Sequence, residues 1–507
     1  MWRKMLPGLI CLLLVGLFAS PLSVHGESIA QPVLGQTQVP ILVEDGLEFK
    51  DLNENGVLDP YEDWRLSPAE RATDLVAKMD SEEKAAQMIH LTLLKPKDIW
   101  FNEQNVGFAL AYSYLAEGPR QAAEKANELQ AWSEASKWGI PLIISMDSVI
   151  GASWVNGATL YPDQIGLGAT RDADLVRRLN EMQREELKAL GVRMSLSPIA
   201  DLATEPRWGR FQECFSEDVD LASEMVVAAI EALQAGNTLS RDSVLVSVKH
   251  FPGSGPQENG VDGSPILFDQ KSLELHLAPF EAAIAAGAGS IMPYGYSEVP
   301  YLGADAAERN AHESHTVMTE LLKDQMGYTG LIQTDWGLRH LDSAIAGADI
   351  LGGAGLREIQ RLATGIDPEE LDAKVHKILE TKFQLGLFEN PYVDPDYAEV
   401  FVGNETHLAL AYEAASKSLT LLKHRFRGPL DEESVIVVGG SLASDLEALN
   451  SGWKTEGNPG SSILDALIAA TGPEQVRFAD LDPALVAGEA QAAIFVVGES
   501  ASTHQPP

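Results

Sequence analysis

The sequence predicts an α/β protein: a (β/α)₈ TIM-like barrel followed by a partial α/β sandwich domain. From about residue 65 to 400, short apolar runs alternate with longer amphipathic stretches. Continuous apolar strands joined by helices indicate a parallel sheet that is covered on both faces. The number of such units favours a closed barrel over an open sheet. A second, shorter strand pattern begins after about residue 430 and predicts the smaller domain.

The composition of the 507 residues excludes several classes of protein. Lys and Arg number 37 against 74 Asp and Glu, which gives a formal net charge of −37. A surface this acidic repels nucleic acids and anionic lipids, so we expect no nucleic-acid partner. Two cysteines, Cys11 and Cys214, are too few for a disulfide framework.

Residues 1–26 have the pattern of a secretory signal peptide. Arg3 and Lys4 precede an apolar stretch at 9–18, and small residues follow near position 26. The stretch is short for a membrane span, although an uncleaved anchor is the alternative. We therefore expect a secreted or periplasmic protein with no integral membrane span after signal cleavage.

Residues 27–64 are expected to form an N-terminal extension with a calcium-type loop at 51–62. A twelve-residue calcium loop supplies oxygen ligands from alternating positions, with a glycine at the sixth position for a sharp turn, and Gly56 stands there. We expect a structural Ca²⁺ here and no cofactor for catalysis. The alternative is an acidic turn that leads into a helix. The six candidate ligands are Asp51, Asn53, Asn55, the carbonyl of Val57, Asp59 and Glu62.

Within the expected barrel, residues 65–400, Ser67 and Pro68 begin a helix as its cap and first residue. Helices are predicted at 174–190, 220–235 and 272–286. Buried strands are predicted at 139–146, 192–196, 244–248, 290–292, 331–333 and 348–351. In the smaller domain, strands are predicted at 435–440, 475–478 and 492–497, with a helix at 464–470.

Polar residues follow five of the predicted barrel strands, in each case just after the carboxyl end of the strand. The carboxyl ends of barrel strands converge on one face, where active sites lie. A single such residue could be a helix cap or an ion-pair partner, but five groups in phase predict one active site. The groups are Asp147, then Asp201 with Arg210, then Lys249 with His250, then Tyr294 with Tyr296, and finally Asp335 with Trp336.

This set of side chains suits carbohydrate chemistry. Retaining glycoside hydrolysis needs a carboxylate nucleophile, and Asp335 suits that role. Asp147 could accept hydrogen bonds from sugar hydroxyls, and Trp336 offers an apolar face for a sugar ring. Nucleotide loops, serine nucleophile elbows and tight metal-ligand spacings do not occur in the sequence. The candidate donors to sugar hydroxyls are Arg210, Lys249 and His250.

Six segments resemble glycoside hydrolase family three, especially its β-glucosidases and exo-β-glucanases. They are DLNENGVLDPYEDW, GATLYPDQIGLGATRD, EPRWGRFQECFSED, KHFPGSG, GYTGLIQTDWG and KFQLGLFENPYV. The resemblance implies a barrel followed by an α/β sandwich, and exo-acting, retaining hydrolysis of terminal β-D-glucosyl residues from β-linked glucosides or oligosaccharides. It implies that Asp335 is the nucleophile and Trp336 the aromatic wall, and that the family tyrosine is Tyr294 or Tyr296. Residues implied to bind the terminal sugar are Asp147, Arg210, Lys249 and His250.

The resemblance is weakest after residue 401, where we expect a linker at 401–430 and the partial sandwich at 431–507. Family β-glucosidases take their acid/base glutamate from the sandwich, and the Gly498-Glu499 pair puts the corresponding place near His504. Glu499, His504 and Asp262 are therefore candidate proton donors. One alternative is an acid/base-deficient, sugar-binding pseudoenzyme of this fold. A lesser one is a β-N-acetylhexosaminidase, although KHFPGSG lacks the Asp and His pair of that group.

Overall fold

The computed structural model describes residues 30–337, 339–425, 429–431, 433–450, 452–479 and 490–498. The predicted signal peptide therefore lies outside the described residues. The chain divides into two units, Met1–Pro32 and Val33–Pro507, and every element below belongs to the second. None of the helices in the described ranges combines the length and the apolar composition that a bilayer span requires.

Eight parallel strands form the sheet that carries the site. They follow chain order around the sheet, except that β10 lies beside β3. A parallel bridge between Gln333 and Ile350 joins β9 to β10 and closes the sheet. The predicted α/β class with a TIM-like barrel is confirmed. The strands are β3 (Ile89–Leu93), β4 (Phe108–Ala111), β5 (Ile143–Met146), β6 (Met194–Ser195), β7 (Leu245–Phe251), β8 (Ser290–Pro293), β9 (Leu331–Ile332) and β10 (Leu351–Gly352).

Six of these strands coincide with the predicted ones, and β3 and β4 are additional. The sequence of β4, Phe-Ala-Leu-Ala, is four residues long and fits a helix as well as a strand. The sequence of β3, Ile-His-Leu-Thr-Leu, places a histidine inside the barrel, which interrupts the apolar run. β7 also runs beyond its predicted end, so Lys249 and His250 belong to the strand itself.

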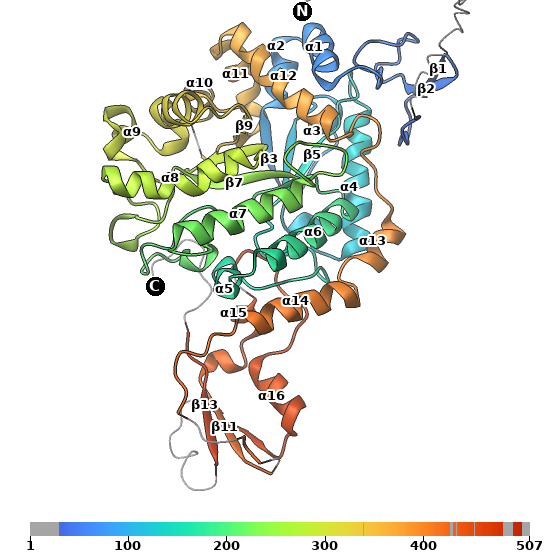
Figure 1. Cartoon of the computed structure of the whole chain (residues 1–507). Helices are drawn as coiled ribbons and strands as arrows, with labels where there is room; N and C mark the ends of the chain where they lie inside the picture. The colour runs from blue at the N-terminus through green and yellow to red at the C-terminus, as the bar shows by residue number, and fades with distance from the viewer. Residues whose placement is uncertain are drawn as a thin grey trace, which may run out of the picture. The chain divides into compact units, whose positions relative to one another are not determined.

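Helices lie around the outside of the barrel, and α6, α7 and α8 are neighbours along it (Figure 1). Their apolar faces join the strands in one continuous core. Ser67 caps α1 as predicted, and the structure adds a reciprocal hydrogen bond from the backbone of Ser67 to the side chain of Glu70. The helices are α1 (Pro68–Lys78), α2 (Ser81–Gln87), α3 (Ile99–Asn102), α4 (Pro119–Glu134), α5 (Gln164–Thr170), α6 (Ala173–Ala189), α7 (Val219–Gln234), α8 (Gln270–Ala285), α9 (Ala304–Glu308), α10 (His340–Ala346), α11 (Ile359–Gly365), α12 (Pro368–Gln384), α13 (Pro395–Phe401) and α14 (Glu405–Ser418), with a wider helical segment at Thr316–Gln325.

Two smaller pieces flank the barrel in the sequence. An antiparallel hairpin, β1 (Ile41–Glu44) and β2 (Leu47–Lys50), precedes the loop at 51–62. After the barrel, β11 (Ile436–Gly439) pairs in parallel with β12 (Val476–Phe478) on one side and with β13 (Ala492–Phe495) on the other. Helices α15 (Leu446–Leu449) and α16 (Ile463–Thr471) complete this C-terminal α/β region, whose elements agree with the predicted strands and helix.

Candidate active site

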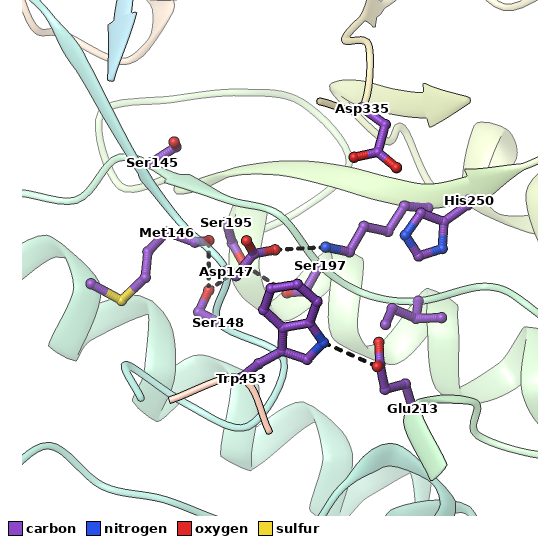
Figure 2. A network of polar contacts seen from close by, with 12 residues as sticks. Ser145, Met146, Asp147, Ser148, Ser195, Ser197, Glu213, His250, Asp335 and Trp453 are labelled. Atoms are coloured by element: carbon purple, nitrogen blue, oxygen red, sulfur yellow. Dashed lines mark hydrogen bonds and ion pairs between the residues drawn. The ribbon is translucent and has the colours of Figure 1, made fainter. Parts of the chain in front are cut away.

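A cavity at the carboxyl ends of the barrel strands brings all six predicted site residues together. The space between these side chains, counted together with its opening to solvent, is about 380 Å³. Figure 2 shows Asp335 and His250 on one side of this space and Asp147 and Trp453 on the other. The lining residues are Tyr112, Asp147, Leu196, Arg210, Lys249, His250, Met292, Tyr296, Asp335, Trp336 and Trp453.

Two backbone amides hold the carboxylate of Asp335. The amide of Trp336 donates to Oδ1 at 2.7 Å and that of Gly295 donates to Oδ2 at 3.3 Å. A Cβ atom on Gly295 would lie 2.7 Å from the Cβ of Asp335, so only glycine permits this approach. The side chain is 9 % exposed. It therefore combines a fixed direction with access to the cavity.

Strand β3 fixes the ring of Trp336. Its Nε1 donates to Oγ1 of Thr92 at 2.7 Å, and the ring meets His90 edge-on at 5.2 Å. Burial lowers the pKa of His90 to about 3. The neutral imidazole of His90 hydrogen-bonds with the hydroxyl of Ser145 at 2.6 Å. Trp336 is thus a rigid, half-buried wall whose position depends on a strand distant in sequence.

Asp147 and Lys249 form a buried ion pair across neighbouring strand ends. Nζ of Lys249 donates to Oδ1 of Asp147 at 2.6 Å, and the side chains are 6 % and 5 % exposed. The hydroxyl of Tyr112 donates to Oδ2 at 2.8 Å. Both oxygens of the Asp147 carboxylate are therefore oriented before any ligand binds.

His250 is oriented from behind by Asp201. Nδ1 of His250 and Oδ2 of Asp201 are 2.8 Å apart, and the amide of Ser254 donates to Oδ1 of Asp201. Burial raises the pKa of Asp201 to about 7. The ring of Tyr294 meets His250 edge-on at 5.1 Å. Nε2 of His250 consequently faces Arg210 and lies 3.3 Å from its Nη2 atom.

Arg210 and Glu213 form a second buried pair, with two parallel hydrogen bonds. Nε and Nη2 of Arg210 donate to Oε1 and Oε2 of Glu213 at 3.0 and 2.8 Å. Burial lowers the pKa of Arg210, but the Glu213 carboxylate outweighs burial and raises the pKa above the ordinary value. Oε1 of Glu213 also accepts a hydrogen bond from Nε1 of Trp453 at 3.0 Å (Figure 2).

Trp453 reaches the cavity from the C-terminal α/β region. Its carbonyl accepts a hydrogen bond from the hydroxyl of Ser153 at 2.6 Å, and the amide of Thr455 donates to the carbonyl of Ser153 at 3.0 Å. The charged groups of Lys249 and Arg210 lie 5.9 and 5.7 Å from the ring centre. Trp453 therefore adds a second aromatic wall over two of the cationic residues.

The sequence left open whether Tyr294 or Tyr296 corresponds to the family tyrosine, and the structure distinguishes the two. Tyr296 lines the cavity and is 41 % exposed, whereas Tyr294 is fully buried. The hydroxyl of Tyr294 donates to Oδ1 of Asp262 at 2.7 Å, and Nε1 of Trp208 donates to the same atom. Asp262 is not among the described residues that line the cavity. Glu499 and His504 lie outside the described residues.

Among the residues that shape this site, sequence reasoning missed Tyr112 and Glu213 and assigned no role to Asp201 or Trp453. Tyr112 follows β4, which like β3 was not predicted as a strand, so the sequence did not reveal that Tyr112 lies at a strand end. Asp201 was placed after a strand but could equally have been a cap or a pairing residue, and Glu213 was not singled out. Their partners, His250 and Arg210, are revealed only by the fold. Trp453 lies in the segment SGW, which resembles a tryptophan-containing segment of the family, but nothing in the spacing connects it to the barrel.

The loop at 51–62 was predicted to bind Ca²⁺. The Asp51 carboxylate accepts hydrogen bonds from the amides of Asn55 and Gly56, and that of Glu62 accepts from the amides of Leu52 and Asp59. Nζ of Lys78 lies 3.0 Å from Oδ1 of Asp59. The donors are all oxygens, as Ca²⁺ prefers, but Lys78 must move before Asp59 can bind a cation. The described residues contain no ready cluster of three or more acidic, His or Cys side chains for a metal.

Known proteins are similar in sequence to most of this chain. The model of the glycosyl hydrolase family 3 N-terminal domain matches residues 81–381. The periplasmic β-glucosidase/β-xylosidase of Dickeya chrysanthemi is 34 % identical over 499 residues, covering 85 % of this chain and 76 % of that protein. The probable β-glucosidase C of Aspergillus flavus is 36 % identical over 448 residues, covering 77 % of this chain and 70 % of that protein.

Solved structures have the same fold. A variant of the exo-1,3/1,4-β-glucanase from a Pseudoalteromonas species is similar with a TM-score of 0.77 and 25 % identity, over 89 % of this chain and 78 % of that chain. A β-glucosidase from Erythrobacter marinus is similar with a TM-score of 0.73 and 26 % identity, over 83 % of this chain. This chain spans 59 % of the length of that β-glucosidase.

Proposed function

This chain belongs to glycosyl hydrolase family 3, and we propose that it is an exo-acting, retaining β-glucosidase. It is a glycosidase that hydrolyses O-glycosyl bonds, and its substrates are β-glucosides or β-glucans from which it releases terminal β-D-glucosyl residues. The observation that carries this proposal is the cavity itself. It combines one oriented carboxylate, Asp335, with acidic and basic side chains and aromatic walls on the other sides.

Asp335 is the nucleophile in this mechanism. One of its carboxylate oxygens attacks C1 of the terminal sugar, the bond from C1 to the leaving oxygen breaks, and that oxygen takes up a proton. Water then attacks C1 of the glycosyl-enzyme ester, loses a proton and releases the sugar with its original configuration. The amides of Gly295 and Trp336 hold the attacking carboxylate in place. Because two backbone groups fix it, little reorganisation is needed before attack.

The other charged residues bind the hydroxyl groups of the sugar. Asp147 accepts hydrogen bonds, and Lys249, His250 and Arg210 donate them. Trp336 and Trp453 present apolar surfaces to the ring or to the leaving group. The buried pairs that hold these side chains before binding reduce the entropy lost when the sugar is bound.

The source of the proton determines which substrates react fastest. The candidate donors Glu499 and His504 lie outside the described residues, and Asp262 is engaged by Tyr294 and Trp208. General acid catalysis contributes roughly a hundred- to ten-thousand-fold to the rate. Aryl glucosides with acidic phenols need little protonation, so with them the attack of Asp335 on C1 depends least on a proton donor, whereas hydrolysis of the glycosyl-enzyme still needs a base. No feature of the described residues favours the pseudoenzyme or the β-N-acetylhexosaminidase.

Replacing the nucleophile tests the proposed function. We expect Asp335→Asn to lower kcat for dinitrophenyl β-D-glucoside by a thousandfold or more, on the order seen when a covalent nucleophile is removed. Asp342→Asn, an aspartate 49 % exposed on the neighbouring helix α10, is the matched control and should leave kcat unchanged. A trapped 2-fluoroglucosyl group should map to the peptide that contains Asp335. Full activity of Asp335→Asn, or a label on another side chain, would contradict the proposal.

We also propose that the protein acts outside the cytoplasm and that loop 51–62 takes up Ca²⁺. The signal-like residues 1–26 support the first point, and a curated relative named as periplasmic agrees with it. For the second point, we expect added Ca²⁺ to raise the melting temperature by a few degrees, because a ligand that binds only the folded state stabilises it. Asp51→Ala should abolish this rise, while Asp45→Ala, an exposed residue in the preceding turn, should retain it. Equal melting temperatures with Ca²⁺ and with a chelator would contradict Ca²⁺ binding.

A further inference from the structure

Tyr112 is the first residue after strand β4, and its side chain lines the active-site cavity. It therefore stands at a strand end, as Asp147 and Asp335 do. Its hydroxyl donates to Oδ2 of Asp147 at 2.8 Å, while Nζ of Lys249 donates to Oδ1 at 2.6 Å. The carboxylate of Asp147 is held from both sides by groups that face the cavity.

The phenol ring of Tyr112 is itself fixed. It lies against the indole of Trp154, with ring centres 4.5 Å apart and planes tilted by 50°. Burial raises the pKa of the Tyr112 hydroxyl, and the nearby charge of Asp147 raises it further. Tyr112 consequently stays protonated at neutral pH and donates its hydrogen bond to Asp147.

A carboxylate has about four lone-pair positions, two on each oxygen. Tyr112 occupies one position on Oδ2 and Lys249 occupies one on Oδ1, which leaves one on each oxygen for the ligand. Asp147 and Asp335 lie on different sides of the cavity (Figure 2). A sugar whose C1 contacts Asp335 therefore presents the hydroxyls remote from C1 to Asp147.

We propose that Tyr112 determines specificity by selecting, through Asp147, which remote hydroxyls of the terminal sugar are accepted. This inference depends on the proposed function, because it assumes a glycosyl group with C1 at Asp335. Without the phenol, the Asp147 carboxylate can rotate about its bond to Lys249 and accept a hydroxyl in another position. Sites that hydrogen-bond a substrate hydroxyl discriminate strongly against analogues that lack it.

Substrate analogues combined with Tyr112→Phe test this inference. We expect kcat/KM for nitrophenyl β-D-glucoside to fall about tenfold, mainly through KM, since the lost hydrogen bond is to a charged group. The fall should be much smaller for at least one of the 3-deoxy, 4-deoxy and 6-deoxy glucosides, for the β-D-galactoside or for the β-D-xyloside. An equal fall for all of these substrates, or no fall, would overturn the role in specificity.

Tyr114→Phe is the matched control. Tyr114 is two residues further along the same segment, is also half-buried, and its hydroxyl donates to Glu128 rather than to a cavity residue. We expect its selectivity to equal that of the unmodified protein. In an Asp147→Asn background, Tyr112→Phe should have little additional effect on selectivity, because both changes act on one carboxylate. Additive effects would show that Tyr112 acts independently of Asp147.

Calorimetric binding of D-glucose and its deoxy analogues separates this inference from the proposed function. If the unmodified protein turns over no glycoside, the proposed β-glucosidase activity fails. A selective loss of glucose affinity in Tyr112→Phe would still support the role of Tyr112 at the sugar site. Unchanged affinities for all analogues would overturn it.

Discussion

The barrel and the C-terminal α/β region contribute to one cavity but differ in how they are stabilised. The barrel has a continuous apolar core that includes strands from all around the sheet. Among the described residues, the apolar core of the C-terminal region contains four buried side chains, Ile436, Val438, Ala443 and Val476. Since burial of apolar surface is the main source of stability, we expect the barrel to be more stable than the described part of the C-terminal region.

The two regions also supply different parts of the site. The barrel provides Asp335, the proposed nucleophile, and the other acidic and basic residues, while the C-terminal region provides Trp453 on a loop. That loop is fastened to the barrel through Ser153 and through Glu213. The comparison indicates that groups needing accurate placement lie on the stable framework. The contact that the less stable region makes is an apolar surface, which tolerates small displacements.

The largest expected effect concerns the buried ion pair between Arg210 and Glu213 in the barrel. We expect Arg210→Ala to reduce the free energy of unfolding by about 3–5 kcal/mol, because it leaves the Glu213 carboxylate buried without its cation. Urea unfolding followed by fluorescence measures this loss. Arg207→Ala, which removes an exposed arginine from the same loop, should have little effect. If Arg210→Ala lowers the free energy of unfolding no more than Arg207→Ala does, the buried pair does not make the barrel the more stable region.

The next effect compares the two regions directly. We expect backbone amides of β11 to exchange with deuterium about a hundredfold faster than those of β5 or β7, because few apolar contacts protect β11. Mass spectrometry of peptides from each strand gives the two rates in one experiment. Similar protection in β11 and β7 would mean that the two regions unfold as one unit.

The smallest effect concerns the contribution of the C-terminal region to binding. We expect Trp453→Ala to raise KM for an aryl β-glucoside about three- to tenfold, which corresponds to the loss of one aromatic contact. Its melting temperature should stay near that of the unmodified protein. Trp64→Ala, at a half-buried tryptophan near the N-terminal hairpin, serves as the control and should leave KM unchanged. An unchanged KM in Trp453→Ala would remove the C-terminal region from substrate binding.

The sequence predicted which residues lie together where those residues follow recognisable strands. Asp147, Arg210 and Asp335 come after apolar runs, and the barrel brings such positions together whatever the details of packing. The same reasoning missed Tyr112, because β4 is too short and too helix-like to be recognised. A strand-end argument can only find residues after strands that have been identified.

Partnerships between distant residues could not be predicted. Asp201 pairs with His250 across 49 positions, and Thr92 fixes Trp336 across 244. Neither pair leaves a periodic or compositional signal, because each depends on the order of strands in the barrel. The choice between Tyr294 and Tyr296 was open for the same reason, since two residues on one segment differ only in the direction of their side chains.

The bridge between Gln333 and Ile350 has a consequence for how the enzyme loses activity on heating. This seam closes the barrel only two residues before Asp335, so the proposed nucleophile is attached to the junction between the last two strands. A fluctuation that parts β9 from β10 would displace the reacting oxygen while the remaining strand pairs stay intact. Heat inactivation should then begin below the temperature at which the molecule as a whole melts.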